Sequence, residues 1–133
     1  MSNKPQNNFD QILEKISELK GKTVSHAGHT YGSMFIFDLD KNTVIVENNN
    51  WRLLNNSKEI INCDTTSAEI NNEITKITGN KIIQITFDKI KLQLSFAFSN
   101  NYLLEIILTE KTHRDLGIKL TNGEWIDIGP VIT

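Results

Sequence analysis

Apolar residues near the N-terminus recur every three or four positions, which is the period of an α-helix. They are Phe9, Ile12, Leu13, Ile16 and Leu19. This spacing predicts a helix over residues 9–20, with Asn8 as its N-terminal cap and Gly21 as its left-handed C-terminal cap. Residues 1–7 are mostly polar, and we expect them to form a flexible tail.

From residue 22 onward, apolar residues recur at every second position, and β-branched and aromatic side chains become frequent. This period predicts β-strands, in which successive side chains point to opposite faces. Five strands are expected before residue 64, and their sequences are KTVSHA, SMFIFDL, TVIVEN, WRLL and KEIIN. Short polar turns such as DKN and NNS join some of them, so the simplest arrangement is an antiparallel meander.

Helical spacing returns over residues 67–78. The apolar face of this second predicted helix consists of Ile70, Ile74 and Ile77. Thr66 and Glu69 have the spacing of a capping box, and Gly79 stands just past the end of the helix. Five more strands are expected after it, with the sequences KIIQITF, IKLQLSFAF, YLLEIIL, GIKL and EWIDI.

The order of predicted elements occurs twice: a helix, a glycine and about five strands make up residues 8–63 and again residues 64–133. Each half ends in a hairpin with one tryptophan, WRLLNNSKEIIN in the first and IKLTNGEWIDIG in the second. We interpret this as an internal duplication within a single domain, residues 1–133, because neither half has enough apolar surface to be stable alone. The predicted fold class is α+β, mainly antiparallel sheet built from two similar helix-plus-strands halves that share one core.

Composition and charge exclude some classes of partner and of binding site. The chain of 133 residues has 14 basic and 16 acidic side chains and a formal net charge of −2. Its Lys and Arg residues form no cluster of the kind that binds phosphates, so nucleic acid is not expected as a partner. The single cysteine, Cys63, excludes an intramolecular disulfide and a multi-cysteine zinc site. There is no apolar run of the roughly 18 residues that span a membrane and no secretory signal, so we expect a cytoplasmic protein.

Two of the three histidines lie close together in the sequence SHAGHTYG. His26 and His29 have a spacing that would place both imidazoles on one face of a helix, but the glycines around them favour a strand end and a turn. A turn at Gly28 would bring the two rings together, with His113 completing a metal or small-molecule site. The simpler interpretation is two loop histidines beside a flexible turn, and no cofactor is expected.

The stretch FDLD places Asp38 and Asp40 on the same face of a predicted strand. Paired carboxylates of this kind bind divalent cations or act as acids and bases. In the simpler interpretation, Asp40 begins a turn and Asp38 faces the solvent. The chain contains no G-x-S-x-G, P-loop or G-x-G-x-x-G motif, so we do not expect an enzyme.

The two tryptophans, Trp51 and Trp125, each stand at the entry to a predicted strand beside a polar turn. An indole at such a place closes the end of the core, which is the favoured role, or contacts a protein partner when it is exposed. The tryptophan occupies the first arm of one hairpin and the second arm of the other, so the repeat is imperfect here. For this reason Trp51 is the predicted contact for a protein partner, together with the acidic Asp38 and Asp40.

Segments of both halves resemble a group of small bacterial proteins. They are GKTV, FIFD and VIVENNNWRLL in the first half, GNKIIQITF, LQLSF, LLEI and TNGEWI in the second, and a closing GP, which together cover about residues 19–130. This pattern resembles uncharacterised bacterial proteins of two sheet-rich halves, some of which are encoded beside polymorphic toxins and interpreted as immunity proteins. The resemblance implies a small cytoplasmic protein that covers a partner's surface or active site, and it carries over no catalytic residue.

Three functions follow as hypotheses. The first is an immunity or inhibitor protein that neutralises a cognate toxin by occluding it, which requires only a rigid scaffold and a surface patch. The second is a metal-binding or small-molecule-binding protein, or an enzyme, that uses His26 and His29. The third is a structural homodimer formed through exposed strand edges.

Overall fold

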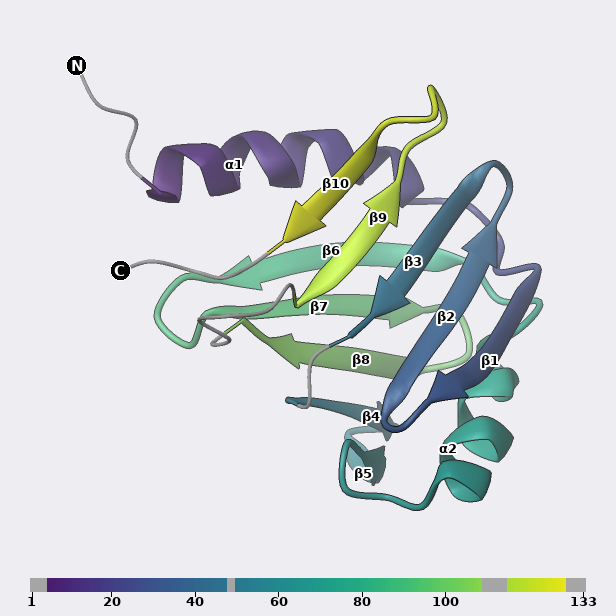
Figure 1. Ribbon diagram of the computed structural model, residues 1–133. Coiled ribbons are helices and arrows are strands. Elements are labelled where there is room, and N and C mark those ends of the chain that lie inside the picture. The colour runs from purple at the N-terminus through teal and green to yellow at the C-terminus, as the bar shows by residue number, and fades with distance from the viewer. Residues whose placement is uncertain (1–4, 48–49, 109–114, 129–133) are drawn as a thin grey trace.

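The computed structural model describes residues 5–47, 50–108 and 115–128. In these ranges the chain forms two α-helices and ten strands in two antiparallel sheets, so the predicted α+β class is confirmed (Figure 1). No α-helix in this part of the chain is long and apolar enough to cross a membrane.

The two halves have the same order of elements. The first half contains α1 (Pro5–Ile16), the 3-10 turn η1 (Ser17–Leu19), β1 (His26–Tyr31), β2 (Met34–Leu39), β3 (Asn42–Val46), β4 (Trp51–Asn55) and β5 (Lys58–Asn62). The second half contains α2 (Ser67–Ile74), the 3-10 turn η2 (Thr75–Ile77), β6 (Ile82–Asp88), β7 (Gln93–Phe98), β8 (Tyr102–Ile107), β9 (Leu116–Lys119) and β10 (Trp125–Ile128).

The halves exchange strands between the two sheets (Figure 1). The strand order is β1-β2-β3-β9-β10 in the first sheet and β5-β4-β8-β7-β6 in the second sheet. Each half contributes its first three strands to one sheet and its last two to the other, with β3 paired to β9 and β4 paired to β8. The simple meander expected from the sequence is therefore wrong after the third strand of each half. Buried residues of both sheets form one core cluster.

An approximate two-fold relation between the halves is visible where the chain leaves η1 and η2. Gly21 N donates to Ile82 O at 2.7 Å, and Gly79 N donates to Val24 O at 2.7 Å. Gly79 and Ile82 stand 58 residues after Gly21 and Val24. A rotation that superposes one half on the other therefore places each of these hydrogen bonds on the other one. Both glycines have left-handed φ angles, 88° and 86°, which glycine adopts without a steric cost. An origin by duplication stays a prediction.

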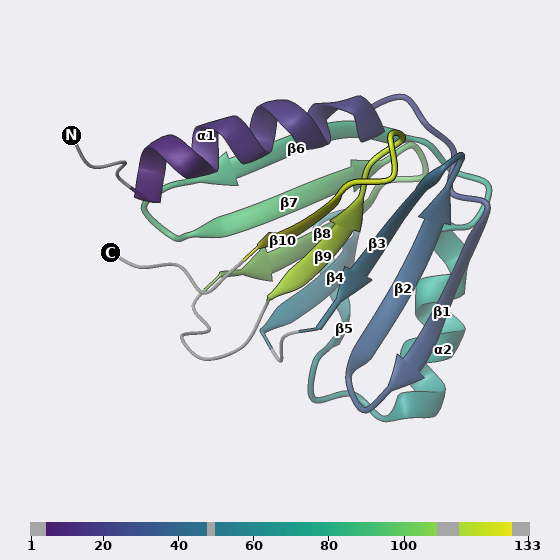
Figure 2. The ribbon, with the colours of Figure 1, turned by 45° about the horizontal axis from the view of Figure 1, so that its top comes forward.

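Each helix closes one open side between the sheets (Figures 1 and 2). α1 lies along the edge strands β6 and β10, and α2 lies beside the edge strands β1 and β5. Five apolar residues of these helices and their 3-10 turns are fully buried, and they are Ile16, Leu19, Ile70, Ile74 and Ile77. The helical apolar spacing predicted from the sequence thus faces the shared core in both halves.

The first helix begins earlier than predicted. α1 starts at Pro5, so Asn8 lies inside the helix instead of capping it, and the predicted tail is wrong for residues 5–7. Proline suits the first turn of a helix because the N–H that it lacks would be unpaired there. The second helix begins as predicted, since the Thr66 side chain accepts a hydrogen bond from Glu69 N at 3.4 Å. Both α-helices continue into a 3-10 turn.

A polar cluster joins η1 to the start of β3 and to the turn between β9 and β10. One carboxylate oxygen of Glu18 accepts hydrogen bonds from Thr121 N at 2.8 Å, Thr121 Oγ1 at 2.7 Å and Asn42 Nδ2 at 2.7 Å. Lys22 Nζ donates to Asn42 Oδ1 at 2.6 Å. Burial acts to raise the pKa of Glu18, but the hydrogen bonds from Thr121 and Asn42 and the charge of Lys22 together outweigh it. The pKa of Glu18 therefore lies below its usual value.

We expect the fold to lose stability as acid protonates Glu18. A carboxyl group whose pKa is lowered by folding stabilises the fold above its unfolded pKa, roughly 4.3, and loses this contribution as the pH falls through the folded pKa. Thermal unfolding of the Glu18→Gln variant should therefore change less than that of the wild type between about pH 5 and pH 3. Glu14→Gln, which removes an exposed carboxylate from α1, is the matched control. Equal acid sensitivity of wild type and Glu18→Gln contradicts the prediction.

Candidate functional site

The two neighbouring histidines point to opposite faces of β1. This stretch is a continuous strand, without the turn that the sequence suggested, and it pairs His26 with Asp38 and His29 with Phe35 on β2. Because side chains alternate along a strand, His26 shares the outer face with Asp38, and His29 shares the face of buried Phe35. His26 Nδ1 lies 3.6 Å from Asp38 Oδ2, whereas His29 Nε2 lies 2.6 Å from Gly32 O. The structure does not bring these histidines to one site.

Metal-binding side chains do not gather elsewhere in the described chain. No group of three or more His, Cys, Asp or Glu residues that could hold a metal ion occurs in residues 5–47, 50–108 and 115–128. His113, the third histidine of the hypothetical site, lies outside these ranges. Cys63 is a free, half-buried thiol that packs against the core.

The two aspartates of FDLD have separate surroundings. Asp38 lies on β2 with 38% of its side chain exposed and accepts a hydrogen bond from Thr43 Oγ1 at 2.8 Å. Asp40 is exposed in the turn between β2 and β3, where its carbonyl oxygen lies 3.5 Å from Lys22 Nζ. One carboxylate thus belongs to the sheet surface and the other to a turn, which is the arrangement of the simpler interpretation.

The two tryptophans have opposite environments. Trp51 is 3% exposed, its Nε1 donates to Ser33 O at 3.1 Å, and its ring meets Phe35 edge-on with centroids 4.7 Å apart. Trp125 is 47% exposed. The predicted partner contact at Trp51 is therefore wrong, because the strand alternation turns this indole into the core. In the strand pairing, the counterpart of Trp51 is Leu116, which occupies the matching buried place on β9.

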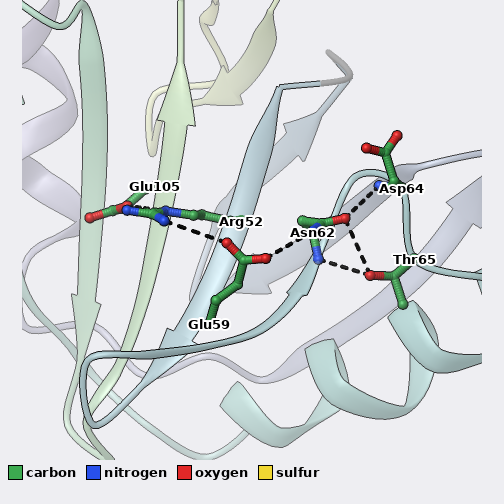
Figure 3. A network of polar contacts seen from close by, with 6 residues as sticks. All are labelled: Arg52, Glu59, Asn62, Asp64, Thr65 and Glu105. Atoms are coloured by element: carbon green, nitrogen blue, oxygen red, sulfur yellow. Dashed lines mark hydrogen bonds and ion pairs between the residues drawn. The ribbon is translucent and has the colours of Figure 1, made fainter.

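The outer face of the second sheet carries an ordered set of charged side chains (Figure 3). On β4, Arg52 Nε donates to Glu105 Oε1 of β8 at 2.6 Å, and Arg52 Nη1 donates to Glu59 Oε1 of β5 at 3.4 Å. Asn62 Nδ2 donates to the other carboxylate oxygen of Glu59 at 2.8 Å. We call these four residues the Arg52 network. It spans three strands because Arg52 is opposite both Glu105 and Asn62 in the pairing register.

This network is anchored to the loop before α2 (Figure 3). Asn62 Oδ1 accepts a hydrogen bond from Asp64 N at 2.8 Å, and Asn62 N donates to Thr65 Oγ1 at 2.9 Å. The hydrogen bond and the charge of Glu105 raise the pKa of Arg52. The side chain of Arg52 is 49% exposed, while that of Glu105 is 13% exposed. Glu105 thus orients the guanidinium group, which stays accessible from the solvent.

A row of apolar side chains lies beside the Arg52 network. Leu54 on β4 is opposite Leu103 on β8, and Leu103 is opposite Ala97 on β7. Ile83, at a register irregularity of the edge strand β6, extends the row and is 52% exposed. We call these four residues the apolar strip. Leu103 and Ala97 are half-buried, so the strip presents part of its apolar surface to the solvent.

Part of the apolar strip lines a shallow hollow of about 470 Å³. Ile83, Ala97 and Leu103 contribute to it. Residues of the β4–β5 and β7–β8 turns also line it, and Asn56 N joins these turns by donating to Asn101 O at 3.1 Å. Both asparagines have left-handed φ angles, 54° and 69°, which asparagine tolerates better than most residues. The hollow therefore combines apolar side chains with polar groups from two connected turns.

Comparisons with family models, with curated proteins and with solved structures found no match. The assignment of the site therefore rests on its geometry and chemistry.

Neither Arg52 nor Glu105 is among the residues predicted from the sequence. Alternation within WRLL and YLLEIIL places both side chains on the face opposite the core, and this signal could have identified them as surface residues. The local sequence of these segments does not indicate that β4 pairs with β8, a pairing that joins the two halves. The ion pair depends on that pairing.

Proposed function

We propose that this chain is a cytoplasmic protein-binding module that inhibits a partner protein, in the manner of an immunity protein, by covering it with the outer face of the second sheet. The observation that carries the proposal is the apolar strip beside the Arg52 network. Specific protein interfaces combine a desolvated apolar centre with a polar rim, and arginine is enriched in them. This face offers both kinds of surface side by side.

The order within the network supports a binding role. Ordering long side chains at an interface costs roughly 0.5–1.5 kcal/mol for each one. Arg52 is already held by Glu105 and Glu59, and Glu59 is held by Asn62. A partner that contacts these groups meets side chains whose freedom is already restricted, which favours binding.

The charges of the network indicate the kind of partner. Two carboxylates, Glu59 and Glu105, surround the single guanidinium of Arg52. Complementary charge across an interface speeds association and excludes wrong partners. We therefore expect the contacted surface to be basic around an apolar centre.

Co-expression with the product of the neighbouring gene tests the proposal. We expect a one-to-one complex on size exclusion and relief of the toxicity that this product causes alone. Arg52→Ala and Leu103→Asp should each weaken the complex by about 2 kcal/mol, or roughly 30-fold. Arg52→Ala removes the group that orders Glu59 and Glu105, and Leu103→Asp places a charge in the apolar strip. Calorimetry of the purified partners measures this change.

Ile90→Ala is the matched control, because Ile90 is an apolar residue that is 96% exposed in the β6–β7 turn, away from the strip. It should leave the affinity unchanged. Absence of a complex and of any relief of toxicity removes the inhibitor function. A complex that tolerates both Arg52→Ala and Leu103→Asp places the binding surface elsewhere.

A further inference from the structure

The outer face of the first sheet carries one aligned side chain on each strand. In order across the sheet they are His26, Asp38, Thr43, Lys119 and Trp125. Each is directly opposite its neighbour in the pairing register, so the five residues form a line across the sheet. We call this line the cross-sheet row. It lies on the side of the molecule opposite the Arg52 network, since the two sheets pack through their inner faces.

The row is acidic on one side of its centre and basic on the other. Asp38 Oδ1 accepts a hydrogen bond from Thr43 Oγ1 at 2.8 Å, and Asp38 Oδ2 lies 3.6 Å from His26 Nδ1. Lys119 is exposed, and its ammonium group has no hydrogen bond or ion pair with another residue of the described chain. Trp125 follows at the edge and is 47% exposed. An acidic and a basic residue therefore stand one strand to either side of Thr43.

We propose that a second copy of this chain packs on this face to form a two-fold homodimer. Asp38 and Lys119 lie on β2 and β9, the two neighbours of β3. A two-fold axis that runs along β3 between the copies places Asp38 of one copy over Lys119 of the other, and repeats this pair by symmetry. The same operation places His26 over Trp125, a ring against a ring. The row is thus complementary to itself.

The contact between Asp38 of one copy and Lys119 of the other is compatible with the angle at which two sheets usually pack. Sheets that pack face to face cross at about 30°. Neighbouring strands are about 4.8 Å apart, so this crossing displaces Asp38 from Lys119 of the second copy by only about 2.5 Å, which the lysine side chain spans. Ile36 and Ile45 are opposite each other on β2 and β3 and are half-buried. They supply an apolar centre next to the charged row.

The equivalent places in the second sheet have a different character. The three central members of the row correspond to Ala97, Leu103 and Leu54, which have the same positions relative to the paired strands. Those residues belong to the apolar strip and carry no charge. Residues of opposite charge on the two neighbours of the central strand therefore distinguish the first sheet from the equivalent places in the second sheet. The dimer leaves the second sheet of each copy open.

Sedimentation equilibrium of the purified protein over a range of concentrations tests the dimer. A face of five short strands is small compared with a standard interface of about 800 Å² per partner, so we expect a weak dimer that dissociates on dilution. Asp38→Lys and Lys119→Asp should each weaken it at least about tenfold, because each places like charges against one another. The double variant Asp38→Lys/Lys119→Asp should restore the wild-type association. Such restoration separates a charge pair from damage to the fold.

Trp125→Ala should also weaken the dimer, and Ile60→Ala is its control. Ile60 precedes Ile61 on β5 as Trp125 precedes Ile126 on β10, and it is 40% exposed on the other sheet. A wild-type protein that remains monomeric at the highest soluble concentration overturns the proposal. So does a double charge variant that associates as weakly as the single variants. The measurement uses this chain alone, so its result is independent of inhibitor binding.

Discussion

Trp51→Ala is expected to lower the free energy of unfolding by about 3–5 kcal/mol, because it leaves a cavity in the core and removes a buried hydrogen bond. The indole is 3% exposed and packs edge-on against Phe35, with ring centroids 4.7 Å apart. It lies on β4 opposite Ile106 of β8, where strands from the two halves pair. The cavity therefore opens at the contact between the halves.

Urea or thermal unfolding measures this loss. For a chain of this size, 3–5 kcal/mol corresponds to a fall in Tm of roughly 11–18 °C. Trp125→Ala is the matched control, since its indole is 47% exposed and exposed substitutions usually change stability by less than about 0.5 kcal/mol. Equal losses for the two tryptophan variants contradict the burial that separates them.

Phe37→Ala is expected to cost a similar amount, about 3–5 kcal/mol. Phe37 is fully buried on β2, and its ring meets those of Phe96 and Phe98 on β7 edge-on, with centroid distances of 6.0 and 5.9 Å. These contacts join the first sheet to the second. Removing the ring thus weakens the packing between the sheets as well as leaving a cavity.

A double-mutant cycle isolates the contact between the rings. Phe37→Leu and Phe96→Leu keep apolar volume but remove the edge-on geometry, so the pair should show a coupling energy of about 0.5–1.5 kcal/mol. Pairing Phe37→Leu with Tyr31→Ala is the control, because Tyr31 is 79% exposed, and these two changes should add. Additive losses for the two phenylalanines are the outcome that contradicts the ring contact.

The helices and the inward-facing residues of the strands were predictable because they depend on close neighbours in the sequence. Ile70, Ile74 and Ile77 follow a helical period, and all three are fully buried. Phe35 and Phe37 follow the period of a strand, and both are fully buried as well. Local periodicity specifies which residues share a face, and this information survives in the folded protein.

The neighbours of each strand were not predictable. β3 pairs with β9 and β4 pairs with β8, although each pair joins strands from different halves. Many strands of this chain have the same alternation of apolar and polar residues, so alternation alone does not distinguish one neighbour from another. The choice depends on how the whole set of strands covers one core. Arg52 and Glu105 meet only as a result of that choice, which is why the network was missed.

The α+β class, the repeated order of elements and the inward face of most strands could be predicted from the sequence, because they depend on local spacing. The sequence also distinguishes the two tryptophans. Trp51 lies two residues from buried Leu53 and so shares its face, whereas Trp125 lies an odd number of residues from buried Ile126 and Ile128 and so faces the other way. The pairing of strands from different halves, and with it the set of charged residues that become neighbours, follows from the tertiary structure. Burial and cross-strand contacts are properties of the assembled sheets, and strands from both halves are needed to form each of them.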